Sequence, residues 1–253
     1  MKVIIITGAS SGMGAEFAKQ LDMELFDVDE FWLVARRKDR MEELAKELQH
    51  PVRIFAEDVR NQSFYGSLEQ QLKENEADIK MLVNNAGYGI VGFAADRSKE
   101  ELLGMIDVNC KAMSAMVSIC LPYMKRNARI LQMASSAAYL PQPKFAVYAA
   151  TKSYVLSFSR ALAEELRPRE IYVTTVCPGP VATEFFDKAE QYGASYGFKK
   201  YFMMDAESVV EEAIRASKRK QNVVTPGLAM KGFRVLTKVV PHDVILKIMR
   251  CMK

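Results

Sequence analysis

The chain has 253 residues, of which 49% are apolar and 26% charged, and its formal net charge is +4. These values are ordinary for a soluble globular domain with a sizeable core. They give no reason to expect nucleic-acid binding, because the lysines and arginines are interspersed with acids and not clustered with aromatic residues.

The sequence starts directly on a strand-like run, so we expect no signal peptide. No apolar stretch approaches the ~18 residues that a membrane span requires, so we expect no membrane span and a cytoplasmic protein. The four cysteines are scattered and the two histidines fall in no motif. This pattern predicts free thiols in a reducing compartment and no metal site.

Short apolar runs alternate with longer helical patterns along the chain, which predicts an α/β fold. The predicted strands are residues 3–6, 31–35, 52–56, 81–84, 129–134, 171–176 and 222–225. The predicted helices include residues 41–49, 62–75, 100–125 and 153–167. The strands are continuously apolar, as in a parallel sheet covered on both faces. We therefore expect a doubly wound parallel sheet of the Rossmann type, in one domain spanning residues 1–253.

A glycine-rich turn follows the first predicted strand and opens a helix. It consists of Thr7, Gly8, Ala9, Ser10, Ser11, Gly12, Met13 and Gly14. Glycines at such a turn let a phosphate approach the backbone, and the amide groups at a helix N-terminus favour a pyrophosphate. Glycines also serve ordinary turns, but the position directly after an apolar strand favours dinucleotide binding.

The second predicted strand ends in Arg36 and Arg37, with no acidic residue before Asp39. An Asp or Glu at this point usually holds the free ribose 2′-hydroxyl of NAD. Two arginines instead suit the 2′-phosphate of NADP through charge-assisted hydrogen bonds. A solvated basic turn is the alternative interpretation, and we favour NADP(H) over NAD.

Tyr148 and Lys152 are four residues apart, which places their side chains on one face of a helix. A phenol has a reference pKa of ~10, so it needs a neighbouring positive charge to act as a base near neutral pH. Such a pair also occurs by chance in helices. Together with Ser135, which follows a predicted strand and could hydrogen-bond a carbonyl oxygen, it predicts a proton-transfer site.

These features together resemble the short-chain dehydrogenase/reductase family, in its single-domain form of about 250 residues. The resemblance runs from Thr7 to about Thr183, in motifs at the ends of successive strands. The motifs are the glycine turn, Asp58, Asn84-Asn85-Ala86-Gly87, Asn109, Ser135, Tyr148 with Lys152, and Pro178-Gly179-Pro180-Val181-Ala182-Thr183.

The resemblance implies a catalytic set of Ser135, Tyr148, Lys152 and Asn109. Tyr148 would be the general acid or base, Ser135 would orient the substrate oxygen, and Lys152 would bind the nicotinamide ribose and lower the tyrosine pKa. Asn109 would hold a water through its backbone carbonyl. Ser136 is adjacent to Ser135, but the end of the strand favours Ser135.

The resemblance also implies where the cofactor lies. Asp58 would contact the adenine, Asn85 and Gly87 would line the cleft, and Val181 and Thr183 would hold the carboxamide. The expected cofactor contacts are Gly8, Ser10, Ser11, Gly12, Met13, Gly14, Arg36, Arg37, Asp58, Val59, Asn85, Ala86, Gly87, Tyr148, Lys152, Pro178, Gly179, Val181 and Thr183.

Two regions interrupt the strand–helix rhythm. Residues 181–205 are rich in aromatics and predict a substrate lid, which suggests an apolar, acyl or steroid-like ketone or secondary alcohol as substrate. Residues 226–253 combine apolar and basic residues at helical spacing, and a subunit contact, a lipid-facing surface and a plain packing helix stay open. The resemblance also implies a homodimer or homotetramer.

The leading hypothesis is an NADP-dependent oxidoreductase. A nucleotide-sensing protein without catalysis is the alternative, because a fold does not fix a function. A sugar-nucleotide epimerase or dehydratase would use the same Tyr and Lys, but such relatives normally carry an additional substrate domain.

Overall fold

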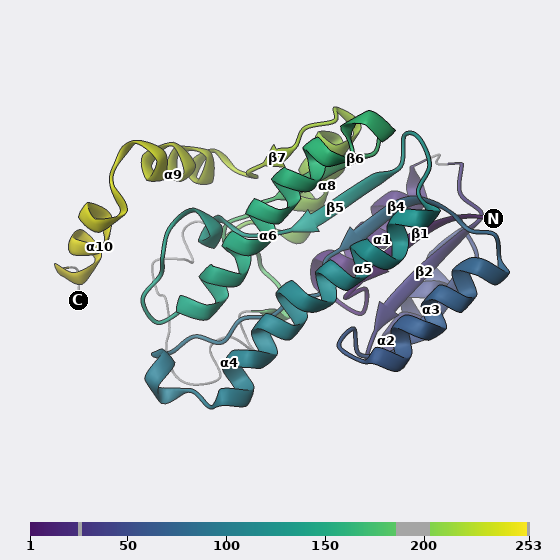
Figure 1. The fold of residues 1–253 in the computed structure, drawn as a ribbon, viewed down its shortest axis with the longest axis horizontal. Helices are drawn as coiled ribbons and strands as arrows, with labels where there is room; N and C mark the ends of the chain where they lie inside the picture. The colour runs from purple at the N-terminus through teal and green to yellow at the C-terminus, as the bar shows by residue number, and fades with distance from the viewer. Residues whose placement is uncertain (25–26, 186–202, 252–253) are drawn as a thin grey trace.

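Seven parallel strands form a single sheet in the computed structural model, which describes residues 1–24, 27–185 and 203–251 (Figure 1). The strand order is β3-β2-β1-β4-β5-β6-β7. The strands are β1 (Lys2–Thr7), β2 (Glu30–Ala35), β3 (Val52–Ala56), β4 (Asp78–Asn84), β5 (Arg129–Met133), β6 (Tyr172–Val176) and β7 (Val223–Val224). All seven predicted strands are present, and the Rossmann-type fold class is confirmed.

Helices cover both faces of this sheet. On one face lie α1 (Gly12–Met23), α2 (Lys38–Glu47) and α8 (Ala206–Lys218). On the other lie α3 (Gln62–Glu74), α5 (Met113–Cys120) and α6 (Ala146–Glu165), with α4 (Lys99–Ile106) leading into α5. Two further helices, α9 (Leu228–Val239) and α10 (His242–Cys251), form an arm that projects from the body (Figure 1).

Alternate residues of each strand enter two separate hydrophobic cores. In β2, Phe31 packs with α1 and α2, whereas its neighbour Trp32 packs with the α3 and α5 layer, and both are fully buried. This alternation follows from the period of two in a strand, and it explains why the strands read as unbroken apolar runs.

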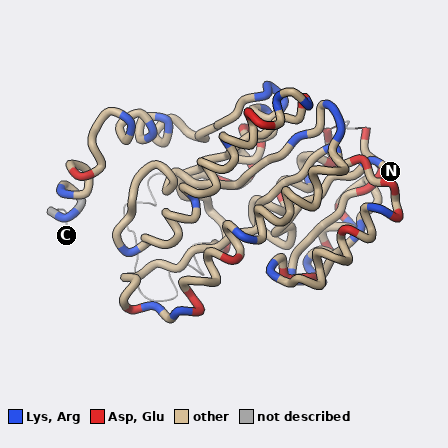
Figure 2. Tube along the Cα trace, viewed as in Figure 1, with Lys and Arg blue, Asp and Glu red and all other residues tan. Residues whose placement is uncertain are grey.

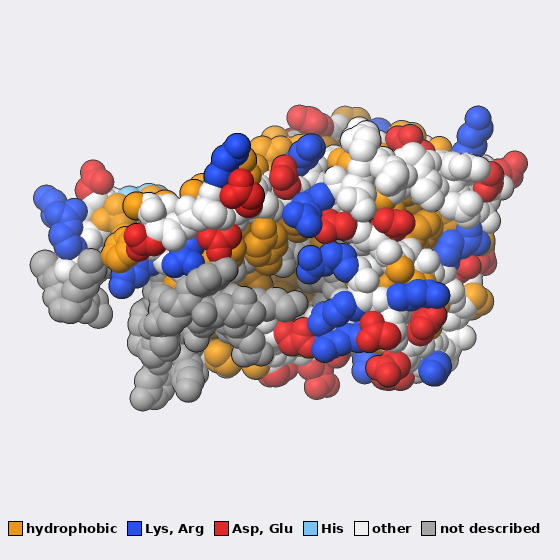
Figure 3. Space-filling view, turned by 90° about the horizontal axis from the view of Figure 1, so that it is seen from below, with side chains coloured by type: hydrophobic (Ala, Val, Ile, Leu, Met, Phe, Trp, Pro, Cys, Tyr) orange, Lys and Arg blue, Asp and Glu red, His pale blue; other side chains and the backbone are white. Residues whose placement is uncertain are grey.

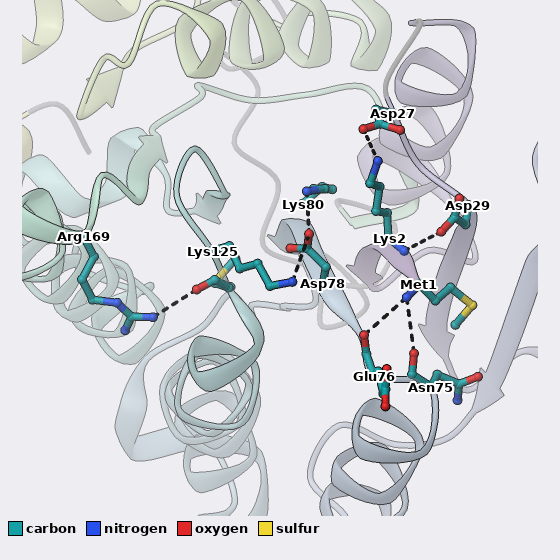
Figure 4. A network of polar contacts seen from close by, with 11 residues as sticks. Met1, Lys2, Asp27, Asp29, Asn75, Glu76, Asp78, Lys80, Lys125 and Arg169 are labelled. Atoms are coloured by element: carbon teal, nitrogen blue, oxygen red, sulfur yellow. Dashed lines mark hydrogen bonds and ion pairs between the residues drawn. The ribbon is translucent and has the colours of Figure 1, made fainter.

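Polar contacts secure the amino-terminal edge of the sheet (Figure 4). The backbone N–H of Lys2 donates to Asp29 at 2.7 Å. The carboxylate of Asp78 accepts from Lys80 at 2.7 Å and lies 3.7 Å from the Lys125 ammonium. These contacts fix the starts of β1 and β4. The candidate functional groups lie at the other end of the strands, where the strands reach their carboxyl ends.

The predicted helix over residues 100–125 is interrupted. A π-helical turn (Asp107–Ala112) joins α4 to α5, and a 3₁₀ turn (Leu121–Tyr123) ends the run. The whole of Lys99–Tyr123 is long and apolar enough to cross a membrane by length and composition, which corrects the expectation that no stretch is. It is weak evidence for a span, because α5 contributes buried side chains to the core beside the sheet.

The predicted helix over residues 153–167 also starts earlier, at Ala146, and ends at Glu165. Its first two turns include Tyr148 and Lys152, which the sequence places on one helical face, and both side chains are buried. Of the predicted lid, residues 186–202 lie outside the described part of the chain. At its ends, Val181 forms an isolated parallel bridge with Met204.

Candidate active site

A cleft of about 450 Å³ opens where the strands reach their carboxyl ends. The strand order changes direction at this point, because β1 has β2 on one side and β4 on the other. In doubly wound sheets, such a switch in strand order is where ligands bind.

The glycine turn forms one wall of this cleft through a close approach of backbone segments. Gly8 and Gly12 have φ of +69° and +53°, in the region that favours glycine. A side chain at Gly14 would place its Cβ 2.1 Å from the Gly8 carbonyl oxygen, so α1 starts against the turn itself. The side-chain amide of Asn85 donates to the Thr7 and Gly8 carbonyls at 3.1 and 3.3 Å, which joins the turn to the end of β4.

This arrangement fits a dinucleotide. The helix N-terminus at Gly12 faces the cleft, and no Cβ fills the space at Gly8 or Gly12. Backbone amides at a helix N-terminus favour a phosphate there.

Arg37 crosses the cleft between the glycine turn and the segment after β6. Its guanidinium donates to the Ser10 hydroxyl at 3.1 and 3.2 Å and to the Ser11 hydroxyl at 2.5 Å. It also pairs with Glu184 at 2.8 Å, and Arg40 binds the same carboxylate. The two arginines lower the pKa of Glu184 to about 2. Arg36 is exposed and lines the cleft without sharing this cluster.

Tyr148 lies buried at the far end of the cleft. Its ring stacks on Phe145 at 4.2 Å between centroids, and Phe185 tilts against it at 5.5 Å. Burial raises the pKa of Tyr148 to about 12, and a hydrogen bond with the Ser135 side chain offsets part of this. The phenol is therefore protonated at neutral pH.

Lys152 lies one helical turn further along α6, with its ammonium 5.7 Å from the centre of the Tyr148 ring. The ammonium donates to the Met133 carbonyl at 2.7 Å, at the end of β5. Burial lowers the pKa of Lys152 to about 8. Desolvation of the phenol sets the direction of the Tyr148 pKa shift. The role of Lys152 in lowering the tyrosine pKa stays a prediction.

Asn109 lies behind the cleft wall and not on it. It belongs to the π-helical turn, which is a type of distortion often found at functional sites. Its side chain accepts from Tyr88 N at 3.0 Å and donates to Tyr88 O at 2.9 Å and to the Thr151 hydroxyl at 3.0 Å. A Cβ on Gly87 would lie 3.0 Å from Asn109 Oδ1 and 3.3 Å from Lys152 Nζ. The absence of a side chain at Gly87 thus leaves room for Asn109 and Lys152 to lie against it.

Comparison with known proteins decides the family. A family model for the short chain dehydrogenase matches residues 2–193. The chain belongs to this family. A curated relative, the NADP-dependent 3-hydroxy acid dehydrogenase of Schizosaccharomyces pombe, is 33% identical over 240 residues, covering 88% of this chain and 89% of the relative.

Two solved structures of the family are similar over almost the whole fold. A short-chain dehydrogenase from Sphingobium yanoikuyae in complex with NADPH has a TM-score of 0.79 at 27% identity, and the match covers 95% of this chain and 96% of that one. A 3-ketoacyl-(acyl-carrier-protein) reductase from Brucella melitensis complexed with NADH has a TM-score of 0.77 at 27% identity, covering 89% and 97%. This short-chain dehydrogenase is thus an oxidoreductase that uses a nicotinamide dinucleotide.

Most of the predicted cofactor contacts line the cleft of this short-chain dehydrogenase. They are Gly8, Ser10, Ser11, Gly12, Met13, Arg36, Arg37, Asp58, Val59, Asn85, Ala86, Gly87, Tyr148, Lys152, Pro178, Gly179, Val181 and Thr183. Gly14 does not line it, because its backbone packs behind the turn against Gly8. Asp58 is held by Arg60, which donates to both carboxylate oxygens at 3.0 and 2.7 Å and lowers the Asp58 pKa.

Several lining residues were not predicted from the sequence: Tyr88, Gln142, Phe145 and Glu184. Phe145 and Gln142 belong to no motif, although Phe145 precedes Tyr148 by only three residues and stacks on its ring. For Glu184, a signal was available, since it directly follows the Thr183 that ends the last motif. Its pairing with Arg37, 147 positions away, could not be read from the sequence.

Proposed function

We propose that this short-chain dehydrogenase transfers a hydride between NADP(H) and an apolar ketone or secondary alcohol. The observation that carries the proposal is that Tyr148, Ser135 and Lys152 line the same cleft, which fits a dinucleotide, with the Lys152 ammonium 5.7 Å from the centre of the Tyr148 ring. The bound nicotinamide supplies or accepts the hydride.

The chain's own residues would manage the proton. In the direction of reduction, the Ser135 hydroxyl donates a hydrogen bond to the substrate oxygen, and the Tyr148 phenol gives its proton to that oxygen as the carbonyl becomes an alcohol. The phenolate left behind is stabilised by the Lys152 ammonium. In oxidation the same proton returns to Tyr148. A pKa near 12 keeps the phenol protonated, which favours the donor role.

Asn109 would hold the residues of the cleft wall in position from the side that faces away from the cleft. Its hydrogen bonds fix Tyr88 and Thr151, and its side chain lies against Gly87 on the cleft wall. A water held by its backbone carbonyl is the role that the family resemblance implies.

The preference for NADP(H) rests on Arg37 and Arg36. Arg37 donates hydrogen bonds to the Ser10 and Ser11 hydroxyls beside the end of β2. These three polar side chains would surround a 2′-phosphate bound there. A planar guanidinium suits phosphate recognition. The relatives do not decide the cofactor, since the names of two refer to NADP or NADPH and one is complexed with NADH.

The apolar substrate rests on the surroundings of Tyr148. Val91, Met105, Ala137 and Phe145 form a buried cluster with it, and Phe185 packs against that cluster. An apolar wall favours a hydrocarbon group beside the reacting carbon. A secondary alcohol is also consistent with the name of the S. pombe relative, which acts on a 3-hydroxy acid.

A nucleotide-sensing protein without catalysis is not favoured, because Ser135, Tyr148 and Lys152 are all present and close together. An epimerase or dehydratase would need room for a sugar nucleotide, which relatives of that kind provide with an added domain. The expected homodimer or homotetramer and the cytoplasmic location remain predictions, which sedimentation velocity and cell fractionation can test.

The test is a screen for NADPH oxidation against ketones, acyl thioesters, oxosteroids and small polar aldehydes, repeated with NADH. We expect turnover of apolar ketones or acyl thioesters, faster with NADPH. Reaction with the polar aldehydes alone would contradict the apolar site, and equal use of NADH would contradict the cofactor preference.

A further inference from the structure

The arm formed by α9 and α10 carries an exposed apolar stripe on a strongly basic segment. In α9 the stripe consists of Leu228, Val235, Leu236 and Val239, at spacings that place them on one helical face. Leu228 is 85% exposed and Val239 is 75% exposed. In α10 the exposed apolar residues are Val244 and Ile248, one turn apart.

The opposite face of α9 is fixed to the body. Met230 packs against Gly179, where an added Cβ would lie 2.8 Å from its Cγ. Arg234 lies over the Tyr139 ring at 5.8 Å, and Lys231 pairs with Glu212 at 2.8 Å. These contacts hold the inner face of α9 against the body. The exposed stripe therefore faces away from the body.

The charge of the arm is distinct from that of the body. Residues 226–253 contain six lysines and arginines and one acid, Asp243, so the segment carries a net charge of +5. The whole chain carries +4, so the remaining residues sum to −1. Figure 2 shows basic positions along both helices, and Figure 3 shows Lys and Arg side chains beside apolar ones on the projecting arm.

We propose that this arm is a membrane-surface anchor that binds anionic lipid headgroups with its exposed Lys238, Lys247 and Arg250 and buries its apolar stripe at the headgroup boundary. Basic amphipathic helices with an apolar face bind lipid in this way. The helices have 12 and 10 residues, which is too short to span a bilayer, so they lie along its surface.

The charge argues for lipid over a second copy of the chain. A two-fold homodimer that paired the arm with itself would bring like charges together, which disfavours that form of association. An anionic bilayer offers both the opposite charge and an apolar interior.

Flotation of the full chain with vesicles tests the proposal. One set is phosphatidylcholine alone, and the other is an equimolar mixture with phosphatidylglycerol. We expect the chain to float with the anionic set and to be released by high salt. Failure of the wild-type chain to float with anionic vesicles overturns the proposal.

Paired variants separate a specific surface from general effects. Val239→Glu should lower vesicle binding at least about tenfold, because a charge replaces a side chain that would be buried. Met23→Glu is its matched control, since Met23 is 74% exposed on the body and should keep normal binding. Equal losses in both variants would contradict the proposal.

The basic residues have a matched pair as well. Lys238→Glu with Lys247→Glu should abolish binding, whereas Lys46→Glu with Lys73→Glu makes the same change in net charge on the body and should leave it intact. Sedimentation velocity completes the test. A wild-type dimer that Val239→Glu dissociates, without vesicle binding, would assign the stripe to self-association and overturn the lipid proposal.

Discussion

Glu184→Gln is expected to tighten NADPH binding. In the structure the Glu184 carboxylate binds Arg37 and Arg40, the groups beside the place where a 2′-phosphate would lie. Phosphate and carboxylate then compete for the same guanidinium. The pair is partly exposed, with side-chain exposures of 32% and 37%, so solvent screens it and the competition amounts to about 1 kcal/mol. That corresponds to about a fivefold lower Kd.

Fluorescence titration with NADPH and NADH measures this effect. The Kd for NADPH should fall about fivefold, and the Kd for NADH should not change, because NADH lacks the competing phosphate. Glu47→Gln is the control, since Glu47 also pairs with a cation, Lys19, but lies on α2 away from the cleft. Weaker NADPH binding by the Glu184 variant, or an equal gain for NADH, would refute the reasoning.

Three further outcomes are expected. Replacing Arg36 and Arg37 by alanine should weaken NADPH binding at least about tenfold more than NADH binding, as titration with both cofactors would show. The kcat/KM for ketone reduction should fall as pH rises through about 8, the pKa of Lys152, because a neutral amine cannot stabilise the forming phenolate; a flat profile across this range would contradict that role. Gly14→Ala should destabilise the fold by about 1–3 kcal/mol in thermal unfolding, whereas Gly66→Ala, in the open interior of α3, should stabilise it by up to about 1 kcal/mol.

The parallel sheet could be predicted because each strand is buried on both faces and reads as an apolar run. The 52–56 strand even has the predicted bounds. Helix continuity was harder to predict. The π-helical turn around Asn109 depends on side-chain hydrogen bonds to Tyr88, which local propensity does not encode. The helix that carries Tyr148 and Lys152 was predicted from their spacing, and the structure extends it back only to Ala146.

For the site, motifs at strand ends located the cleft because all parallel strands end at one edge of the sheet. The contacts between residues of different motifs could not be predicted from the sequence. The pairing of Arg37 with Glu184 and the stacking of Phe145 on Tyr148 arise from tertiary packing. The burial of Tyr148, which raises the pKa of its phenol, could not be predicted either, because the sequence indicates a neighbouring charge but not the degree of desolvation.

Tyr148→Phe tests the central claim most directly, with Tyr154→Phe as the control on the same helix. Tyr154 is 44% exposed and hydrogen-bonds the Ser114 hydroxyl, so its loss should leave catalysis unchanged. With a substrate found in the screen, Tyr148→Phe should lower kcat by about 10²-fold or more and keep the Kd for NADPH within about threefold, a difference below 1 kcal/mol. Normal turnover by the Tyr148 variant would contradict the account.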